Sequence, residues 1–264
     1  MILFTSDLDR TLIYSKRMME NYPVDGDIIP IEYKGDDIIS YMSLDSIEML
    51  RQFNEKQLFV PVTTRAVYQY ERIEVFQNDI QPKYAITSNG GTILVDGKVD
   101  EEWGKLIQQR IAATAIPNED LLRVFADIRH EEWVAKEFYV DALFYMFHVH
   151  LDRIPHAELR AFESRIGELG WRLFLHGRKL YILPTELNKA HAVDHLQKYL
   201  TYDMHVAAGD SLMDYDMLLQ ADIGYSPAHG EIFERRENDS KVAWINAAGA
   251  TSTEDLLRNI LQLD

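Results

Sequence analysis

The sequence predicts an α/β protein whose parallel central sheet is interrupted in the chain by a second, inserted α/β domain. Two blocks, residues 1–100 and 184–264, alternate short apolar runs with helical segments, and this alternation is typical of parallel sheets covered by helices. Between them, residues 101–183 follow a different order of helices and strands. A length of 264 residues suits one large domain or two of modest size.

The first block opens with a short apolar strand at residues 2–4. A hairpin is predicted around residues 34–37, as a flap beside a site or as a plain surface hairpin. The other elements of this block follow from apolar runs, helical spacing and turn residues. They are a helix from Ser43 or Asp45 to Lys56, a strand at 58–62, a helix through Tyr68, Arg72 and Phe76, a strand at 84–87, a turn at 88–91 and a tight hairpin around 96–97.

The same signals divide the rest of the chain. The insert is predicted to contain helices at 103–115 and 118–125, a strand at 143–149, a helix at 155–169 and a hairpin with strands at 171–176 and 179–183. The alternation then resumes with a helix at 189–200, strands at 204–208, 223–225 and 242–245, and a last helix opened by a capping box at 251–254. His191 and His195, four residues apart on the first of these helices, are expected at the surface.

The composition excludes several classes of function. The formal net charge of −16 argues against nucleic acid or an anionic membrane as a partner, because both attract Lys and Arg. Without cysteine, the chain has no disulfide, thiolate nucleophile or cysteine-based zinc site. No apolar run approaches the ~20 residues of a membrane helix, and a strand starting at residue 2 leaves no room for a signal or transit peptide. A cytoplasmic protein is therefore expected, while the oligomeric state stays open.

Two carboxylates end the first strand. Asp7 and Asp9 lie two positions apart, so in an extended chain they begin on the same side. The C-terminal end of a parallel strand borders the crevice in which open α/β sheets bind ligands. Two close carboxylates repel unless they hold a cation or share a proton, and both arrangements suit phosphate chemistry. A plain surface turn is the alternative, because Asp is a common turn residue.

Further polar residues follow later strands or begin a later helix, namely Thr63, Lys189, Asp210 and Asp214. With the acidic pair, they resemble in order and type the four motifs of the haloacid dehalogenase-like (HAD) phosphatase superfamily. The insertion between the second and third motifs, after the turn at 89–91, resembles the subgroup that contains sucrose-phosphate phosphatase, phosphomannomutase and Cof-type sugar phosphatases. The resemblance implies a Rossmann-like core at 1–100 and 184–264 and an α/β cap at 101–183.

The resemblance also implies roles for these residues. Asp7 would attack phosphorus and form an aspartyl-phosphate, and Asp9 would act as general acid and then as general base. Thr63 would donate a hydrogen bond to a phosphoryl oxygen, and Lys189 would neutralise the charge that develops there. Mg²⁺ would bind Asp7, the backbone carbonyl of Asp9 and Asp210. Asp214 would hold Lys189 or a metal-bound water.

Substrate contacts are expected from both parts of the chain. In the core, Thr64, Arg65 and Asn89 lie beside the second motif or in the turn before the insert. In the insert, the polar faces of two strands carry His148 and Arg172, which we expect to contact the leaving group of the substrate.

Three positions depart from the family pattern. Arg10 stands where glycine is usual and would tighten phosphate binding or face solvent. Thr64 replaces the glycine of the usual T-G-R triplet, and Met213 replaces an asparagine common before the last aspartate. The expected function is nevertheless that of a Mg²⁺-dependent phosphomonoesterase acting on a small phosphorylated metabolite, with sugar phosphates as the expected class. The alternatives are a phosphomutase of the phosphomannomutase type and a non-catalytic binding or regulatory protein.

Overall fold

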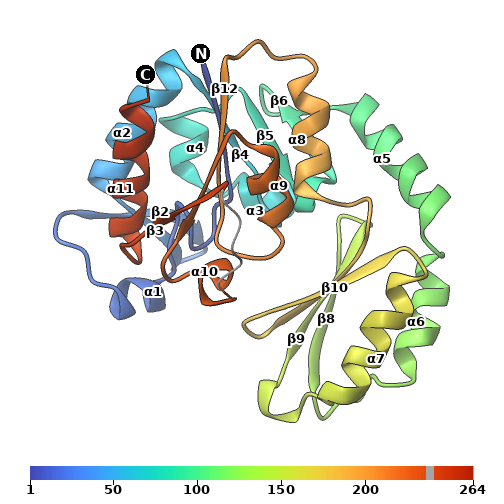
Figure 1. Cartoon of the computed structure of the whole chain (residues 1–264). Coiled ribbons are helices and arrows are strands. Elements are labelled where there is room, and N and C mark those ends of the chain that lie inside the picture. The colour runs from blue at the N-terminus through green and yellow to red at the C-terminus, as the bar shows by residue number, and fades with distance from the viewer. Residues whose placement is uncertain (236–240, 264) are drawn as a thin grey trace. The chain divides into compact units, whose positions relative to one another are not determined.

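The computed structural model describes residues 1–235 and 241–263, and the chain forms two compact units (Figure 1). The core unit comprises Met1–Asp100 and Lys189–Asp264, and the inserted unit comprises Glu101–Asn188. The inserted unit thus extends past residue 183, the end expected for the inserted domain. One cause is a backbone hydrogen bond of 2.9 Å from Thr185 N to Gly170 O, which ties the segment after the last inserted strand to this unit.

The core unit is built on a five-stranded sheet in the order β14-β13-β12-β1-β4. Every neighbouring pair in it is parallel, which confirms the predicted fold class. The first strand, β1, is buried at every position, as expected for a strand covered on both faces. The strand bounds are β1 Ile2–Ser6, β4 Leu58–Pro61, β12 Met204–Ala208, β13 Ile223–Pro227 and β14 Val242–Ile245.

Helices lie on both sides of this sheet (Figure 1). Helices α2 and α11 pack against each other and contribute Leu50, Phe53 and Leu257 to the main apolar core, whereas α8 contacts α9. The helix bounds are α1 Lys16–Asn21, α2 Leu44–Lys56, α3 Val67–Tyr70, α4 Glu74–Asn78, α8 Lys189–Gln197, α9 Tyr215–Gln220, α10 Glu231–Arg235 and α11 Ala250–Leu261. Within residues 1–235 and 241–263, no helix has the length and apolar character needed to cross a bilayer.

Two smaller sheets complete the core unit. The hairpin of β2 (Ile28–Lys34) and β3 (Asp37–Ser43) is antiparallel. Strands β5 (Tyr84–Thr87), β6 (Thr92–Val95) and β7 (Lys98–Val99) form an antiparallel sheet. A parallel bridge from Val62 to Ile86 joins this sheet to the segment after β4. The 3₁₀ turn η1 (Ser88–Gly90) therefore begins close to the end of β4.

The inserted unit is a four-stranded antiparallel sheet in the order β10-β11-β9-β8. Its own apolar core joins one sheet face to α6 and α7, through residues such as Phe125, Phe147 and Phe162. The bounds are α5 Glu101–Thr114, α6 Asn118–Ala126, β8 Val134–Val140, β9 Phe144–Val149, η2 Leu151–Arg153, α7 His156–Gly167, β10 Trp171–His176 and β11 Lys179–Pro184.

Two sequence predictions about helices are wrong. The single helix through Tyr68, Arg72 and Phe76 is divided into α3 and α4, because Ile73 between them is extended and pairs with Glu32 of β2. The capping box at 251–254 is also absent. Helix α11 instead begins after Gly249, whose φ of 61° lies in the left-handed region, and the Thr253 hydroxyl donates to Thr11 O over 2.7 Å.

Two further differences concern one strand and one side chain. Strand β8 has no counterpart in the sequence prediction, because the consecutive charges Lys136 and Glu137 interrupt its apolar pattern. His195, predicted at the surface, is buried in α8 and its ring contacts Tyr199 at a centroid distance of 5.3 Å. Most of the short helix α8 is buried, since Ala192, Val193 and Leu196 also face the interior.

Candidate active site

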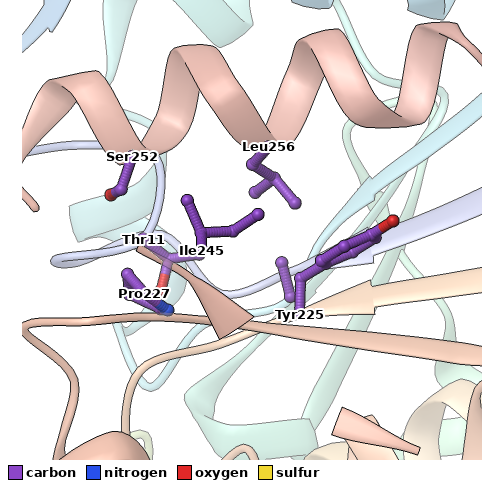
Figure 2. A pocket seen from close by; sticks show the side chains of 7 residues that line it. Thr11, Tyr225, Pro227, Ile245, Ser252 and Leu256 are labelled. Carbon is purple, nitrogen blue, oxygen red and sulfur yellow. The ribbon is translucent and has the colours of Figure 1, made fainter. Parts of the chain in front are cut away.

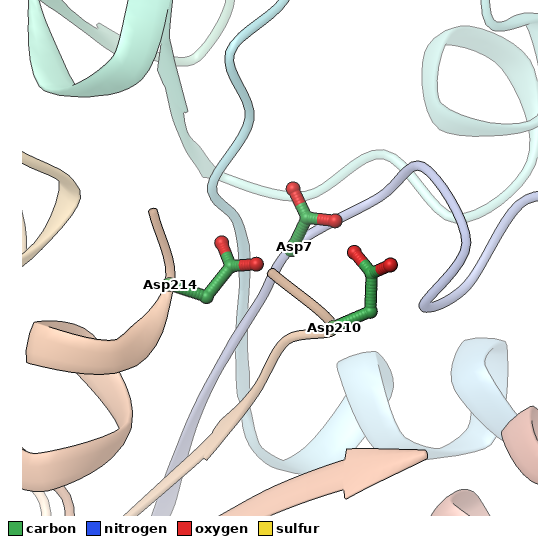
Figure 3. A group of neighbouring side chains, drawn as sticks. All are labelled: Asp7, Asp210 and Asp214. Carbon is green, nitrogen blue, oxygen red and sulfur yellow. The ribbon is translucent and has the colours of Figure 1, made fainter. Parts of the chain in front are cut away.

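The ends of β1 and β12 bring three carboxylates together. Ser6 is paired with Ala208, and Asp7 N donates to Ala208 O over 2.9 Å, so Asp7 and Asp210 follow adjacent strand ends. One oxygen each of Asp7, Asp210 and Asp214 lies within 4.8 Å of the others. Figure 3 shows the three side chains converging from two segments of the chain, Asp7 from the end of β1 and Asp210 and Asp214 from the turn after β12. All three are buried, which is costly for carboxylates unless positive charge compensates them.

Asp214 is fixed by the loop that follows β12. Ser211 donates to its Oδ2 twice, from the backbone N at 2.9 Å and from the hydroxyl at 2.8 Å. Gly209 permits the close approach of this loop, because a Cβ there would lie 2.3 Å from Asp214 Cβ. The sequence Gly209–Asp214 therefore forms a compact turn that points two carboxylates to one place.

Lys189 supplies positive charge to this group. It is the first residue of α8, is only 1% exposed, and its Nζ donates to Asp7 Oδ1 at 2.5 Å and to Asp214 Oδ1 at 2.6 Å. Burial opposes the charge of this ammonium group, but Asp214 and Asp7 outweigh that effect and raise its pKa above the ordinary value. Lys189 is therefore a fixed cation between two carboxylates.

The surroundings of Asp7 carry negative charge in spite of Lys189. Burial raises the pKa of its carboxyl well above the ordinary value, Lys189 opposes this, and the neighbouring Asp214 and Asp210 add to it. Three buried carboxylates thus exceed the charge of one lysine, and their oxygens are the ligand type that Mg²⁺ prefers. The donor set of Asp7, Asp210 and Asp214 fits a divalent cation.

Arg10 contributes a second cation from an unusual backbone position. Its φ of 66° is left-handed, a conformation that glycine adopts without steric cost, which explains why glycine is usual here. Its Nε donates to Asp210 Oδ2 at 2.8 Å and its Nη2 to His229 O at 2.7 Å. The sequence predicts that Arg10 either binds phosphate or faces solvent. In the structure its side chain instead binds the carboxylate of Asp210.

Asp9 points elsewhere than Asp7 does. Its carboxylate is 53% exposed and accepts from Arg65 Nε at 2.7 Å and from Nη2 at 2.9 Å. This bidentate arrangement is the strong form of an Arg–carboxylate pair. The second motif therefore contacts the acidic pair through Arg65, a residue that the sequence predicts to bind substrate.

The other predicted core residues surround the end of β4. Thr63 is fully buried, and its Oγ1 accepts from Arg65 N at 3.1 Å. Asn89 N donates to Thr63 O at 3.0 Å, and the φ of Asn89 is 57°, which asparagine tolerates better than most residues. Thr64 is half-buried and Met213 is buried. Thr63 and Asn89 are thus connected through the backbone, and their chemical roles remain predictions.

Glu32, which has no role predicted from the sequence, is fully buried in β2. It accepts from Arg65 Nη1 at 2.7 Å and from Arg72 Nη2 at 2.9 Å. A signal for it exists in the sequence, because Glu32 is a single carboxylate within an apolar strand. Such a residue needs a buried cation as partner, and Arg65 in the second motif and Arg72 shortly after it are candidates.

His148 and Arg172 belong to the inserted unit. They lie on β9 and β10, on the sheet face opposite the apolar core of that unit. Partial burial and the nearby Lys179, Lys136 and Arg178 lower the pKa of His148, and Arg172 lies 5.1 Å from the Phe174 ring centroid. This face therefore carries both cations and aromatic rings.

Two cavities in the described residues do not suit a phosphate. Figure 2 shows one in the core unit, where Thr11, Tyr225 and Leu256 line a space of about 10 Å³, roughly enough for one water. The other, of about 320 Å³, lies in the inserted unit between residues such as Ile111 and Trp171, and its lining includes no charged side chain. Neither offers the charges gathered at the ends of β1 and β12.

Comparisons with known proteins give a family match and a shared fold. The model of the sucrose-6F-phosphate phosphohydrolase family matches residues 1–248. A sucrose-phosphatase from Synechocystis sp. PCC6803, solved with sucrose and phosphate, is similar at 17% identity and a TM-score of 0.70, over 100% of this chain and 98% of that one. No curated protein gives a significant sequence match.

Two further solved structures share the fold. A haloacid dehalogenase-like hydrolase from Bacillus subtilis is 15% identical with a TM-score of 0.56, over 98% of this chain and 91% of that one. A sugar phosphatase of HAD subclass IIB is 13% identical with a TM-score of 0.59, over 98% of this chain and 99% of that one. At these identities the solved structures establish the fold.

Proposed function

We propose that this chain, which belongs to the sucrose-6F-phosphate phosphohydrolase family and is a phosphatase, hydrolyses a sugar phosphate through a covalent intermediate on Asp7. The resemblance to HAD phosphatases predicted from the sequence is confirmed by this membership. The membership supports an enzyme over the alternative of a non-catalytic protein. The observation that carries the proposal is the contact of Lys189 with both Asp7 and Asp214 beside Asp210.

Asp7 is the proposed nucleophile. Its carboxylate oxygen forms a bond to phosphorus while the bond from phosphorus to the sugar oxygen breaks, which leaves an aspartyl-phosphate. Lys189 neutralises the negative charge that gathers on the phosphoryl oxygens, and Thr63 donates a hydrogen bond to one of them. Both are held in place before the reaction by buried contacts, so little reorganisation is needed in the transition state.

Asp9 is the proposed general acid and base. Its carboxyl gives a proton to the leaving sugar oxygen, and the resulting carboxylate later takes a proton from the water that hydrolyses the aspartyl-phosphate. Its partial exposure leaves room for a substrate beside it, and Arg65 fixes its orientation.

Mg²⁺ is the proposed cofactor. Asp7, Asp210 and the backbone carbonyl of Asp9 would hold it, with Asp214 orienting Lys189 or a bound water. When bound, the ion supplies positive charge to a phosphoryl group, which positions it and lowers the barrier to attack. The excess of buried carboxylates over lysine supports this assignment.

The inserted unit is the proposed specificity domain. Within it, His148 and Arg172 would contact the sugar, because their sheet face offers hydrogen-bond donors beside aromatic rings. Thr64 and Asn89 would complete the substrate contacts on the core unit.

A panel of sugar phosphates, with sucrose 6-phosphate among them, tests the proposal. We expect Mg²⁺-dependent release of phosphate from at least one of them, and loss of that release in Asp7→Asn. Conversion between phosphate isomers without release would instead identify a phosphomutase. Undiminished release by Asp7→Asn would contradict the proposal.

A further inference from the structure

Glu32 is a buried carboxylate that no step above uses. Its side chain is 0% exposed. Four hydrogen bonds reach its two oxygens: Oε2 accepts from Arg65 Nη1 at 2.7 Å and from the Ser40 hydroxyl at 2.8 Å, and Oε1 accepts from Arg72 Nη2 at 2.9 Å and Nε at 3.2 Å. A carboxylate so completely satisfied is held in one position.

The hairpin that carries Glu32 is irregular at this point. The pairing of β2 with β3 shifts between Pro30 and Glu32 and again between Glu32 and Tyr33. As a result two consecutive residues face inward, Ile31 into the apolar core and Glu32 toward the arginines. Such bulges commonly redirect a side chain beside a functional site. The bridge from Glu32 to Ile73 fixes the same residue through its backbone.

Arg65 joins Glu32 to the acidic pair. One part of its guanidinium, Nη1, donates to Glu32, while Nε and Nη2 donate to the two oxygens of Asp9. The guanidinium is planar and rigid, so the position of Glu32 determines the plane in which Asp9 is held. The side chain of Arg65 is only 11% exposed, which leaves it little freedom to rotate.

We propose that Glu32 is a positioning residue for the general acid, acting on Asp9 through Arg65. This inference rests on the proposed function. In the step concerned, the bond from phosphorus to the leaving oxygen breaks, the electron pair stays on that oxygen, and the oxygen takes the proton of the Asp9 carboxyl. The Asp9 carboxyl must be oriented toward the leaving oxygen for this transfer. Glu32 fixes that orientation without contacting the substrate.

Two substrates with different leaving groups distinguish a positioning role of Glu32 from a purely structural one. A sugar alkoxide is a poor leaving group and needs the proton from Asp9. p-Nitrophenolate is a stable anion and leaves without it. Misplacement of Asp9 therefore lowers kcat/KM, which reports the steps up to release of the leaving group, for the first substrate and spares it for the second. The later hydrolysis of the aspartyl-phosphate, in which Asp9 acts as base, is common to both substrates and does not enter kcat/KM. General damage to the site lowers kcat/KM for both.

The experiment compares Glu32→Gln with the unaltered protein on a sugar phosphate and on p-nitrophenyl phosphate. We expect kcat/KM for the sugar phosphate to fall by about 10-fold or more, part of the 10²–10⁴ that a positioned acid contributes. We expect kcat/KM for p-nitrophenyl phosphate to stay close to the original value. Glu32→Asp, which keeps the charge, should recover part of the loss.

Controls keep the test decisive. Glu48→Gln removes an exposed carboxylate from α2 and should change neither rate. If Glu32→Gln does not fold, the double variant with Arg72→Gln, which removes one charge of each sign, carries the same comparison. Equal losses of kcat/KM on both substrates, or no loss on either, would overturn the inference. Phosphate release that survives Asp7→Asn would instead overturn the proposed function, and this inference with it.

Discussion

Arg10 illustrates how one side chain alters a site at the scale of single residues. Its left-handed backbone costs on the order of 1 kcal/mol relative to glycine, and its guanidinium binds a carboxylate proposed to hold the metal. The guanidinium of Arg10, bound to Asp210 Oδ2, competes with a metal ion for that oxygen. We therefore expect arginine in place of the usual glycine to act on metal affinity.

For Arg10→Gly we expect Mg²⁺ to bind about tenfold more tightly, since removal of a guanidinium 2.8 Å from Asp210 is worth on the order of 1 kcal/mol at a partly exposed site. Isothermal titration with Mg²⁺, without substrate, measures this directly. Weaker binding in the variant would show instead that Arg10 orients Asp210 for the metal.

His205 gives a pH-dependent stability. It is buried between Thr5 Oγ1 at 2.8 Å and the Gln197 side chain at 3.0 Å, and burial lowers its pKa to about 4. The unfolded chain, with an ordinary value near 6.5, takes up the proton first as the pH falls. The contribution of neutral His205 to the free energy of unfolding is therefore full above about pH 6.5 and is lost as the pH falls to about 4.

The expected loss is about 3 kcal/mol in the free energy of unfolding. Urea unfolding of the unaltered protein and of His205→Gln at several pH values isolates the contribution of His205. All other groups titrate in both proteins, so their effects cancel in the difference. The difference in stability between the two proteins should narrow as the pH falls. A difference independent of pH would contradict the assignment of a neutral buried histidine.

At the scale of elements, the turn after β12 depends on Gly209. An added Cβ would lie 2.3 Å from Asp214 Cβ, so the loop or the carboxylate must move. We expect Gly209→Ala to cost about 1–3 kcal/mol of stability and to lower kcat, because Asp214 orients Lys189. Gly104→Ala is the matched control: it lies in α5 with open space around it and should stabilise the protein by up to ~1 kcal/mol. Thermal unfolding of both variants measures the two changes in stability. Equal changes in the two variants would contradict the steric explanation.

The elements also show what the sequence could predict. The strand ends with Asp7, Thr63 and Asp210 were predictable, because buried parallel strands are mostly apolar and are followed here by polar residues. Helix breaks and caps were not, because tertiary partners override local signals. Ile73 pairs with Glu32, and Thr253 bonds to Thr11 rather than to its own helix end. The link from Glu32 to Asp9 depends on such contacts and is invisible in local patterns.

At the scale of the whole molecule, binding and chemistry are proposed to reside in different units. The formal net charge of −16 repels anions, so an anionic substrate depends on local cations such as Lys189. The face of the inserted sheet with His148 and Arg172 is a second place where positive charge gathers.

For His148→Ala and Arg172→Ala we expect KM to change by about 10-fold among sugar phosphates, the range for loss of a hydrogen bond that involves a charge. Hydrolysis of p-nitrophenyl phosphate, which offers no sugar, should be spared. Steady-state kinetics on several esters measures this. Unchanged selectivity would remove these two residues from the substrate site.

The central claim is that phosphorus becomes bonded to Asp7 during turnover. Rapid acid quenching with substrate and Mg²⁺, followed by peptide mass spectrometry, tests it most directly. We predict that the peptide containing Asp7 gains the mass of one phosphoryl group during turnover and loses it when the substrate is exhausted. A phosphoryl group found only on another residue, or on none while phosphate is being released, would contradict the account.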